Sequence, residues 1–356
     1  MFPNTDSGIH LGLTFDYGIS DTSTLVGKVD YIWGAAAPIA GIHCDHYIPF
    51  DIDRQQDLAA WEAQQPSWVT YSAPGQSATY PGQSWAVLDN SNEAVRAYQV
   101  SRVKAALSEG FDGIGWDDYG FTNFENRQGV YQDGAWTSLE YPARNEWNDK
   151  YKSDMIEWLA SMYQAFKAFP NKTLTINYVP EVGPVDMVSK VAPHLDGLFD
   201  EDGFSAYRKN RNQWEAHIKN LDHLNSLGKA WMDNNVYDVA MDTAVTSDQI
   251  NWTLANYLLV KESASYVYIY SAGSGGGNYG SFFDRPEYHA AVGKPVSIRR
   301  ADGTLWRRHY EGGIVYVNPP GAGSRVINLT QVHRDLSGKD TKRVALQAGQ
   351  AIVLLN

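Results

Sequence analysis

Eight short apolar runs of strand type, spread over the first 273 residues, constrain the fold of this chain most strongly. Each run is rich in β-branched and aromatic residues and ends in polar residues or glycine. The runs cover residues 9–18, 29–35, 67–73, 111–118, 174–181, 195–202, 229–235 and 265–273. Segments with helical patterns stand between several of them, at 91–110, 143–169, 212–228 and 247–264. Strands alternating with helices predict an α/β fold, here a (β/α)8 TIM barrel.

A doubly wound open sheet is the alternative α/β architecture. It would place a glycine-rich phosphate loop after the first strand, and none follows residues 9–18. A glycine-rich run at 272–280 follows the last strand instead, and it lacks the Lys-Ser/Thr pair of a P-loop. We interpret it either as a loop at the rim of the barrel or as a linker to a following domain.

After about residue 282 the pattern changes to short alternating strands separated by Gly, Pro and Asp turns. This predicts a small antiparallel, sandwich-like β-domain over residues 282–356, beside a barrel over residues 1–281. Glu311, Gly312 and Gly313 predict a hairpin turn within it. The segment has no obvious catalytic grouping, so a structural cap is favoured over a sugar-binding role.

Charge and composition narrow the classes of partner. The net charge of −12 disfavours nucleic acid, whose binding needs clustered Lys and Arg. No apolar run approaches the ~20 residues of a membrane span, and no signal peptide is visible at the N-terminus. Both a secreted and a cytoplasmic location therefore stay open, as does the oligomeric state. The 12 Trp, 22 Tyr and 12 Phe favour a carbohydrate partner, although large aromatics also fill cores.

Two of the strand-like runs end in clustered carboxylates. FDGIGWDD ends in Asp117 and Asp118, and LDGLFDED ends in Asp200, Glu201 and Asp202. Side chains alternate along a strand, and this alternation places Asp117 and Glu201 on the inner face, at the barrel end where active sites lie. A shifted alignment matches Asp118 with Glu201, so the acting acid within each cluster stays open.

Other strand ends supply polar and aromatic side chains that suit sugar hydroxyls and ring faces. For a single member such as Asp16, a capping or turn-forming role is equally consistent with the sequence. The residues that we expect to bind substrate are Asp16, Trp33, His46, Asp118, Asn177, Asp200, Asp233, Asn235 and Tyr270.

The segment HCDHY at 43–47 contains two histidines and an aspartate that could bind a metal. A metal site in a hydrolase barrel usually draws ligands from several strand ends, and no His-x-His ends the first strand here. We therefore interpret 43–47 as a polar rim loop after the second strand, and we expect neither a metal nor an organic cofactor. His217 and His223 lie six residues apart on no common helical face, and they receive no functional role.

The stretches AVLDNSNEAVRAYQ (86–99) and GFDGIGWDDYG (110–120) resemble those of the hypothetical glycosyl hydrolase family 15 group, which has α-amylase-like barrels. More distantly, they resemble the endo-α-1,4-polygalactosaminidase group. These families show LD-x-x-N-P-x-V-R before a long helix and G-F/Y-D-G-V-F-L-D at the fourth strand. Asn90–Arg96 and Gly110–Asp117 match, with Glu93 where proline is common. The resemblance covers the barrel and the C-terminal β-domain.

The resemblance implies that Asp117 is the nucleophile or base and Glu201 the acid. It does not distinguish retaining from inverting chemistry. The sequence thus predicts a glycoside hydrolase that cleaves O-glycosidic bonds of an oligo- or polysaccharide with two carboxylates. Two alternatives stay open. One is a non-catalytic carbohydrate-binding barrel, and the other is a metal-dependent hydrolase or isomerase that uses His43 and His46.

Overall fold

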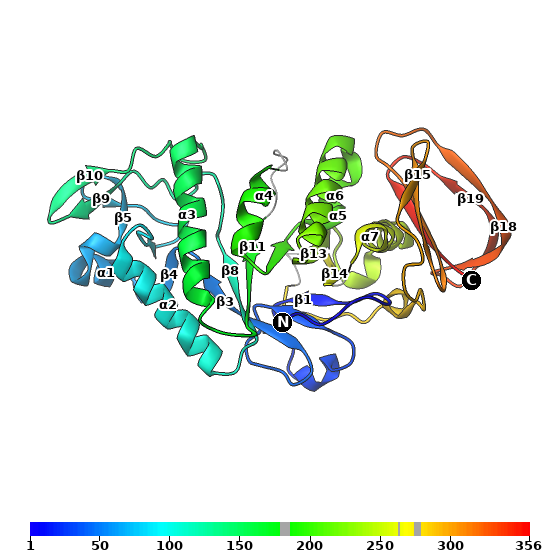
Figure 1. Cartoon of the computed structure of the whole chain (residues 1–356), viewed down its shortest axis with the longest axis horizontal. Coiled ribbons are helices and arrows are strands. Elements are labelled where there is room, and N and C mark those ends of the chain that lie inside the picture. The colour runs from blue at the N-terminus through cyan, green and yellow to red at the C-terminus, as the bar shows by residue number, and fades with distance from the viewer. Residues whose placement is uncertain (179–185, 263, 274–278) are drawn as a thin grey trace.

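The computed structural model describes residues 1–178, 186–262, 264–273 and 279–356, and its centre is a sheet of eight parallel strands (Figure 1). The strands follow the order β1-β2-β3-β8-β11-β12-β13-β14, and a parallel bridge between Leu11 and Val267 joins the first to the last. The predicted barrel is therefore confirmed. Its strands are β1 (Gly12–Thr14), β2 (Tyr31–Trp33), β3 (His43–Pro49), β8 (Gly113–Asp117), β11 (Thr173–Asn177), β12 (Gly197–Asp200), β13 (Ala230–Tyr237) and β14 (Ser265–Ser271).

The third barrel strand is β3, so two sequence predictions were wrong: a barrel strand at 67–73 and a rim loop at 43–47. The inward side chains of β3 are polar, which gives HCDHY the appearance of a loop. Asp45, for example, is fully buried and accepts hydrogen bonds from the hydroxyls of Tyr31 and Thr175, each at 2.7 Å. The barrel interior at this level is a polar network rather than an apolar layer.

Residues 50–92 and 118–148, here called the side lobe, leave the C-terminal ends of β3 and β8 and pack together (left in Figure 1). The lobe contains β4 (Ile52–Asp57), α1 (Leu58–Gln64) and β7 (Trp85–Val87). A four-stranded antiparallel sheet, ordered β10-β9-β5-β6, combines β5 (Thr70–Ala73) and β6 (Gln76–Ser77) with β9 (Gly129–Gln132) and β10 (Ala135–Ser138). The segment expected as the third barrel strand thus pairs with an insertion that follows the fourth.

A buried ion cluster joins the two parts of the side lobe. The Arg127 guanidinium, 1% exposed, pairs with Asp51 from the first part and with Glu125 at 2.8 Å. Such a cluster is destabilising unless each charge has a partner, so it fixes one arrangement of the two insertions.

The four predicted helices are present as α2 (Glu93–Ser108), α3 (Asp149–Phe166), α6 (Arg211–Ser226) and α7 (Ser247–Val260). Asn92, Asn148 and Asn210 cap the first three, and Thr246 with Gln249 forms a capping box on α7. Two short helices, α4 (Asp186–Val191) and α5 (Gly203–Ala206), complete the later connections. Residues 15–42, all described, link β1, β2 and β3 with only a 3-10 turn at Thr22–Leu25, so the helical layer is incomplete there.

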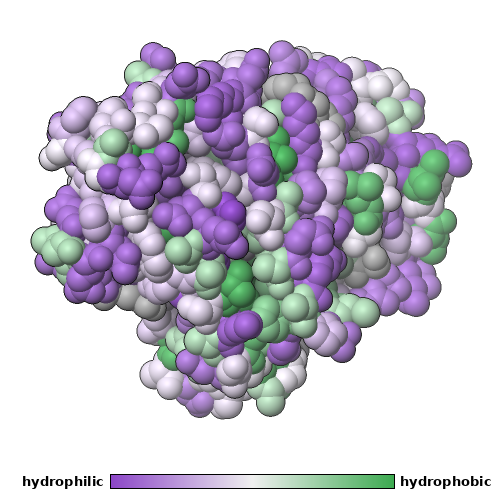
Figure 2. All heavy atoms as spheres, turned by 60° about the vertical axis from the view of Figure 1, so that its left-hand side comes forward, coloured by the Kyte–Doolittle hydropathy of each residue, from purple (hydrophilic) through white to green (hydrophobic). Residues whose placement is uncertain are grey.

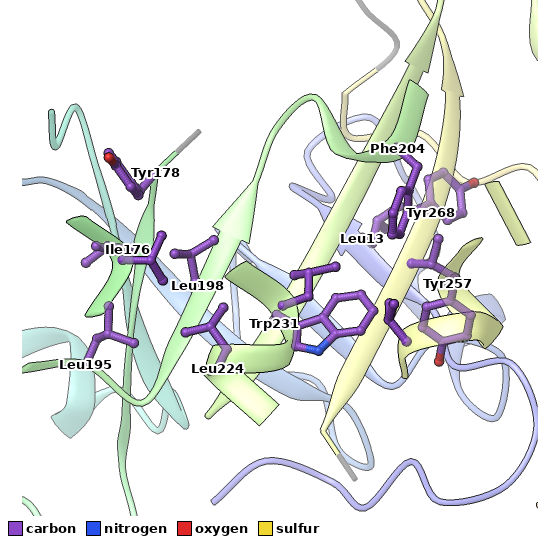
Figure 3. Close-up of a cluster of buried hydrophobic side chains, with 14 of the residues drawn as sticks. Leu13, Ile176, Tyr178, Leu195, Leu198, Phe204, Leu224, Trp231, Tyr257 and Tyr268 are labelled. Carbon is purple, nitrogen blue, oxygen red and sulfur yellow. The ribbon is translucent and has the colours of Figure 1, made fainter. Parts of the chain in front are cut away.

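Alternation along the barrel strands separates two kinds of packing. Outward side chains such as Ile176, Leu198 and Trp231 pack under the helices, as Figure 3 shows with Leu195 and Leu224. The inner face holds an aromatic cluster of Tyr31, Trp33, Phe199, Met232 and Tyr266.

Position 113 faces inward, and it is a glycine because no larger residue fits there. A β-carbon at this position would lie 2.2 Å from the Asp45 carboxylate and equally close to the Thr173 hydroxyl. Asp117 lies four residues further along β8, on the same face.

Asp200 and Asp233 lie on the outer face of neighbouring strands, with His217 of α6 between them. The three side chains are 0–2% exposed. His217 Nε2 lies 3.0 Å from Asp233, and Nδ1 lies 3.4 Å from Asp200. The two carboxylates outweigh burial and raise the pKa of His217, which favours the imidazolium beside them. Burial raises the pKa of Asp200 to about 7, although the positive charge of His217 lowers it.

The C-terminal residues form a six-stranded antiparallel sheet in the order β15-β16-β17-β20-β18-β19 (right in Figure 1). Its strands are β15 (Arg300–Asp302), β16 (Leu305–Tyr310), β17 (Gly313–Asn318), β18 (Arg325–Asp335), β19 (Asp340–Leu346) and β20 (Gln350–Leu355). The pairing of Tyr310 with Gly313 confirms the predicted hairpin turn. The sheet packs on α7, where the Tyr310 hydroxyl donates to the Leu258 carbonyl. The proposed domain boundary at residue 282 stays a prediction.

Figure 2, which brings the side-lobe half forward, shows a surface on which hydrophobic residues form small groups among hydrophilic ones. Among the described residues, no helix combines the length and the apolar character that crossing a bilayer requires.

We predict that His217→Phe lowers the free energy of unfolding by about 3–5 kcal/mol at pH 7, because it leaves two buried carboxylates uncompensated. Urea denaturation followed by circular dichroism measures this change. His223→Phe on the same helix is the matched control, and it should cost far less because no carboxylate pair flanks His223. Adding Asp200→Asn and Asp233→Asn to His217→Phe should recover part of the loss. Equal stability of the two histidine variants would contradict the compensating role.

Candidate active site

Three adjacent strand ends bring two carboxylates and one amide together at the C-terminal mouth of the barrel. Asp117 ends β8, Asn177 ends β11 and Glu201 directly follows β12. The Asn177 Nδ2 donates to Asp117 Oδ1 at 2.8 Å and to Glu201 Oε2 at 3.2 Å. These two carboxyl oxygens therefore lie no more than about 6 Å apart. The barrel unites the two acid clusters that were expected to act together.

Two tyrosines hold the other sides of this pair. The Tyr47 hydroxyl, from β3, donates to Asp117 Oδ2 at 2.8 Å. The Tyr279 hydroxyl hydrogen bonds with Glu201. Both oxygens of Asp117 thus accept hydrogen bonds, which is an environment that stabilises a carboxylate anion.

The surroundings of Glu201 favour its protonated form. Burial raises the pKa of Glu201 above its ordinary value, and the negative charge of Asp117 adds to this effect. The hydrogen bonds from Asn177 and Tyr279 oppose it, because they stabilise the charged form. A raised pKa makes a carboxyl group better suited to serve as a general acid.

Asp118 occupies a backbone conformation that is uncommon for a residue with a side chain. Its φ is +61°, in the left-handed region, directly after the end of β8. Its carboxylate accepts a hydrogen bond from Arg54 Nη2 at 3.1 Å. Burial, Asp117 and Asp51 raise the pKa of Asp118 to about 8, although Arg54 lowers it.

The mouth contains a cavity of about 280 Å³ that the carboxylates share with aromatic and polar residues. It is lined by Asp117, Asp118, Tyr119, Gly120, Phe121, Thr122, Asn177, Tyr178 and Glu201. Of the expected rim loop at 272–280, residues 274–278 lie outside the described residues. So do residues 179–181, the end of the predicted fifth strand.

Of the nine residues expected to bind substrate, Asp118 and Asn177 lie at the cavity. Asp16 is 3% exposed and accepts a hydrogen bond from the Ala36 amide at 2.7 Å, so it stabilises a turn. Trp33 stacks on Phe199 inside the barrel, with 4.6 Å between ring centroids. Asp16 therefore forms a turn and Trp33 packs in the core, and neither side chain lines the cavity.

The other five side chains that were expected to contact substrate also have partners away from the cavity. His46 points outward, where its ring packs on Phe111. Tyr270 is fully buried and exchanges hydrogen bonds with the backbone of Thr14. The Asn235 side chain is likewise fully buried among backbone partners. Asp200 and Asp233 face α6 as described above. None of these five side chains lines the cavity.

The metal-site alternative built on His43 and His46 is contradicted by the geometry. They are three positions apart on β3, with two residues between them, so they lie on opposite faces of the strand. His43 points inward, where its Nε2 lies 2.8 Å from the Thr173 hydroxyl. Among the described residues, the group with spacing suited to a metal is Asp200, His217 and Asp233. There His217 Nε2 is hydrogen-bonded to Asp233, and Nδ1 lies in ion-pair contact with Asp200 at 3.4 Å.

Sequence reasoning missed Tyr47, Tyr279 and Arg54. Tyr47 would have been found if HCDHYIP had been recognised as a strand, because alternation then points Tyr47 inward with Asp45. Tyr279 follows the glycine-rich run, whose interpretation as a rim loop hinted at such a contact. Arg54 belongs to the side lobe, and no local pattern places it beside Asp118.

The chain was compared with known proteins at the levels of sequence and structure. The sequence model of hypothetical glycosyl hydrolase family 15 matches residues 45–314. No curated protein matches the sequence significantly.

Solved structures share the fold at low sequence identity. Amy13B of Eubacterium rectale has a TM-score of 0.51 and 10% identity, with 89% of this chain and 79% of that chain covered. The noncanonic maltogenic α-amylase AmyB of Thermotoga neapolitana has a TM-score of 0.50 and 11% identity, with 89% and 76% covered. The glycoside hydrolase domain of PelA from Pseudomonas aeruginosa has a TM-score of 0.46 and 12% identity, with 74% and 94% covered.

The family match spans most of the barrel and reaches the second long strand of the C-terminal sheet. It includes β8, the Asn90–Arg96 stretch and all three residues of the carboxylate–amide arrangement. The resemblance noted in the sequence is thereby confirmed. The chain belongs to hypothetical glycosyl hydrolase family 15, and it is a glycoside hydrolase that acts on carbohydrate.

Proposed function

We propose that this glycoside hydrolase cleaves O-glycosidic bonds with Asp117 and Glu201, without a metal or an organic cofactor, and that it retains the anomeric configuration. One observation carries the proposal: a single Asn177 nitrogen hydrogen bonds to both carboxylates. The resulting limit of about 6 Å between their oxygens suits retaining enzymes, whose carboxyls lie ~5–5.5 Å apart. Inverting enzymes need ~6.5–9.5 Å, to leave room for a water molecule.

In the proposed first step, Glu201 donates its proton to the leaving glycosidic oxygen while Asp117 attacks the anomeric carbon. The carbon–oxygen bond to the leaving group breaks as a glycosyl ester with Asp117 forms. In the second step, Glu201 acts as a base and removes a proton from water, which attacks the anomeric carbon and releases Asp117. The sugar unit, its linkage and the endo or exo mode are open.

The amide and the tyrosines have distinct supporting roles. Asn177 keeps the two carboxylates at a fixed separation, and Tyr47 holds the second oxygen of Asp117. Because the Glu201 carboxylate gains hydrogen bonds from Asn177 and Tyr279, these groups support the form that acts as a base in the second step. Asp118, held by Arg54, contributes charge or binds hydroxyls.

A non-catalytic carbohydrate-binding barrel was one of the two alternatives compatible with the sequence. It would be favoured by carboxylates pointing apart or lying beyond 10 Å. The shared hydrogen-bond donor does not fit that arrangement.

We predict that Glu201→Gln lowers kcat by about 10²–10⁴-fold and that Asp117→Asn lowers it at least as much. A digestion screen of oligosaccharides with product analysis identifies the substrate for these assays. Asp118→Asn is the matched comparison, because it neutralises the neighbouring carboxylate and should leave kcat closer to that of the unsubstituted enzyme. Near-normal turnover by both the Asp117 and Glu201 variants, with native circular dichroism spectra, would sink the assignment. A larger loss for Asp118→Asn than for Asp117→Asn would move the nucleophile to Asp118.

The first product released should have the anomeric configuration of the substrate. Proton NMR during the first minutes of hydrolysis measures this configuration before mutarotation. Azide should also restore glycosyl transfer to Asp117→Ala, because it can enter the space left by the nucleophile and attack from the same face. Initial release of the opposite anomer would show that Asp117 activates water instead.

Activity at alkaline pH should extend further in a Tyr279→Phe variant. The acid must be protonated, so kcat/KM falls as pH rises through the pKa of Glu201. Tyr279 lowers that pKa by stabilising the carboxylate, and its removal raises the pKa. The alkaline limb of the kcat/KM profile should therefore move to higher pH. Tyr17→Phe, at an exposed ring packed against Gly280, should leave the limb in place. A limb that moves to lower pH in Tyr279→Phe would contradict the assigned acid.

A further inference from the structure

We propose that the side lobe carries a second sugar-binding site, which engages a unit of a neutral oligosaccharide beyond the one at the catalytic carboxylates. The site is a cluster of three inclined rings, Tyr80, Trp85 and Phe124, here called the platform; the Tyr80 ring is inclined by 41° to Trp85 and by 71° to Phe124. The position of this site along the sugar chain rests on the proposed function, because the sugar must cross the carboxylate pair to reach the platform.

The three rings come from both insertions of the side lobe and meet at its surface. Tyr80 precedes β7 and Trp85 begins it, whereas Phe124 follows β8. The Tyr80 ring centroid lies 5.3 Å from that of Trp85 and 5.4 Å from that of Phe124. Phe124 is 39% exposed, and the other two rings are partly exposed. The platform therefore exists only when the two insertions are assembled.

A continuous row of side chains connects the platform to the catalytic pair. The Arg54 guanidinium lies 4.2 Å from the centre of the Trp85 ring and 5.3 Å from that of Tyr47. Tyr47 in turn donates to Asp117 at 2.8 Å. Arg54 also pairs with Asp118, which lines the cavity. The platform is thus continuous with the cavity through one arginine and one tyrosine.

The chemistry of this row suits a sugar chain. Aromatic faces offer apolar area to the C–H face of a pyranose ring, and they lose little conformational entropy on binding. The Arg54 side chain is one-third exposed and can donate hydrogen bonds to hydroxyls at the ring edge. Tyr80 and Trp85 also pack beneath on Ile52, Ala78 and Val87. Phe124 lies outside the buried apolar clusters of the described residues, so lobe packing alone does not account for it.

The test uses the Asp117→Asn protein as parent, so that bound sugar is not consumed. Isothermal titration with maltohexaose, cellohexaose and chitohexaose, and with the corresponding disaccharides, gives the dissociation constants. For a hexaose that the parent binds, Tyr80→Ala and Phe124→Ala should each raise Kd by about 3- to 10-fold, the range expected for one lost aromatic contact. The disaccharide Kd should change less than the hexaose Kd, because a disaccharide has fewer units to place beyond the carboxylates.

The matched control is Trp136→Ala. Trp136 packs against Tyr71 and Tyr131 in the outer sheet of the same lobe, so its loss loosens the lobe without removing a platform ring. It should leave the Kd for the hexaose unchanged. The proposal is overturned if the platform variants bind the hexaose like the parent, if Trp136→Ala weakens binding equally, or if the parent binds none of the three hexaoses. These readouts need no turnover, so they are separate from a failure of the proposed catalytic roles.

Discussion

The hydrogen bonds of the Asn177 amide to Asp117 and Glu201 are the constraint on which the candidate site depends. They follow from the register of the barrel, because β11 pairs with both neighbouring strands: Ile176 lies opposite Trp116 on β8, and Asn177 lies opposite Phe199 on β12. The inward residue at the end of β11 therefore falls between the two acids. An amide has two N–H donors and no charge to titrate. It can hold two carboxylates close together in either protonation state, which a two-step acid and base mechanism requires.

Buried charges behind the strands keep these ends in place. On the outer face, Asp200 accepts hydrogen bonds from the amides of Asp202 and Gly203, each at 3.0 Å, and so shapes the turn that carries Glu201. His217 compensates the negative charge that this arrangement buries. Arg127 has the same function for Asp51 in the side lobe. At Asp200 the buried carboxylate organises the backbone near the mouth, whereas the pair of Arg127 with Asp51 joins the two insertions of the side lobe.

Much of this arrangement is encoded in local pattern, and the rest is not. Alternation in FDGIGWDD and LDGLFDED predicts that Asp117 and Glu201 face inward, and the structure has both at the mouth. The same rule, applied residue by residue, would have turned Asp200 and Asp233 outward, but proximity to a strand end alone suggested that they bind substrate. β3 escaped detection because its inward residues satisfy one another rather than forming an apolar stripe. The sheet of the side lobe pairs β5 with β9, across a barrel strand and α2, and such a long-range pairing leaves no periodic signal.

Burial and the crowding of acids at the mouth together favour the protonated carboxyl that the proposed chemistry needs. Asp117, Asp118 and Glu201 line one cavity, and Arg54 is the cation that pairs with them among the described residues. If all three carboxyls were ionised, their mutual repulsion and their partial loss of hydration would make the charged forms unfavourable. Burial is the largest cause of the raised pKa values of Glu201 and Asp118, and the charges of neighbouring carboxyls add to it. Asp117 accepts hydrogen bonds on both oxygens, from Asn177 and from Tyr47. In the proposed mechanism, the division into nucleophile and acid therefore depends on the burial, charge and hydrogen bonds of the whole cluster.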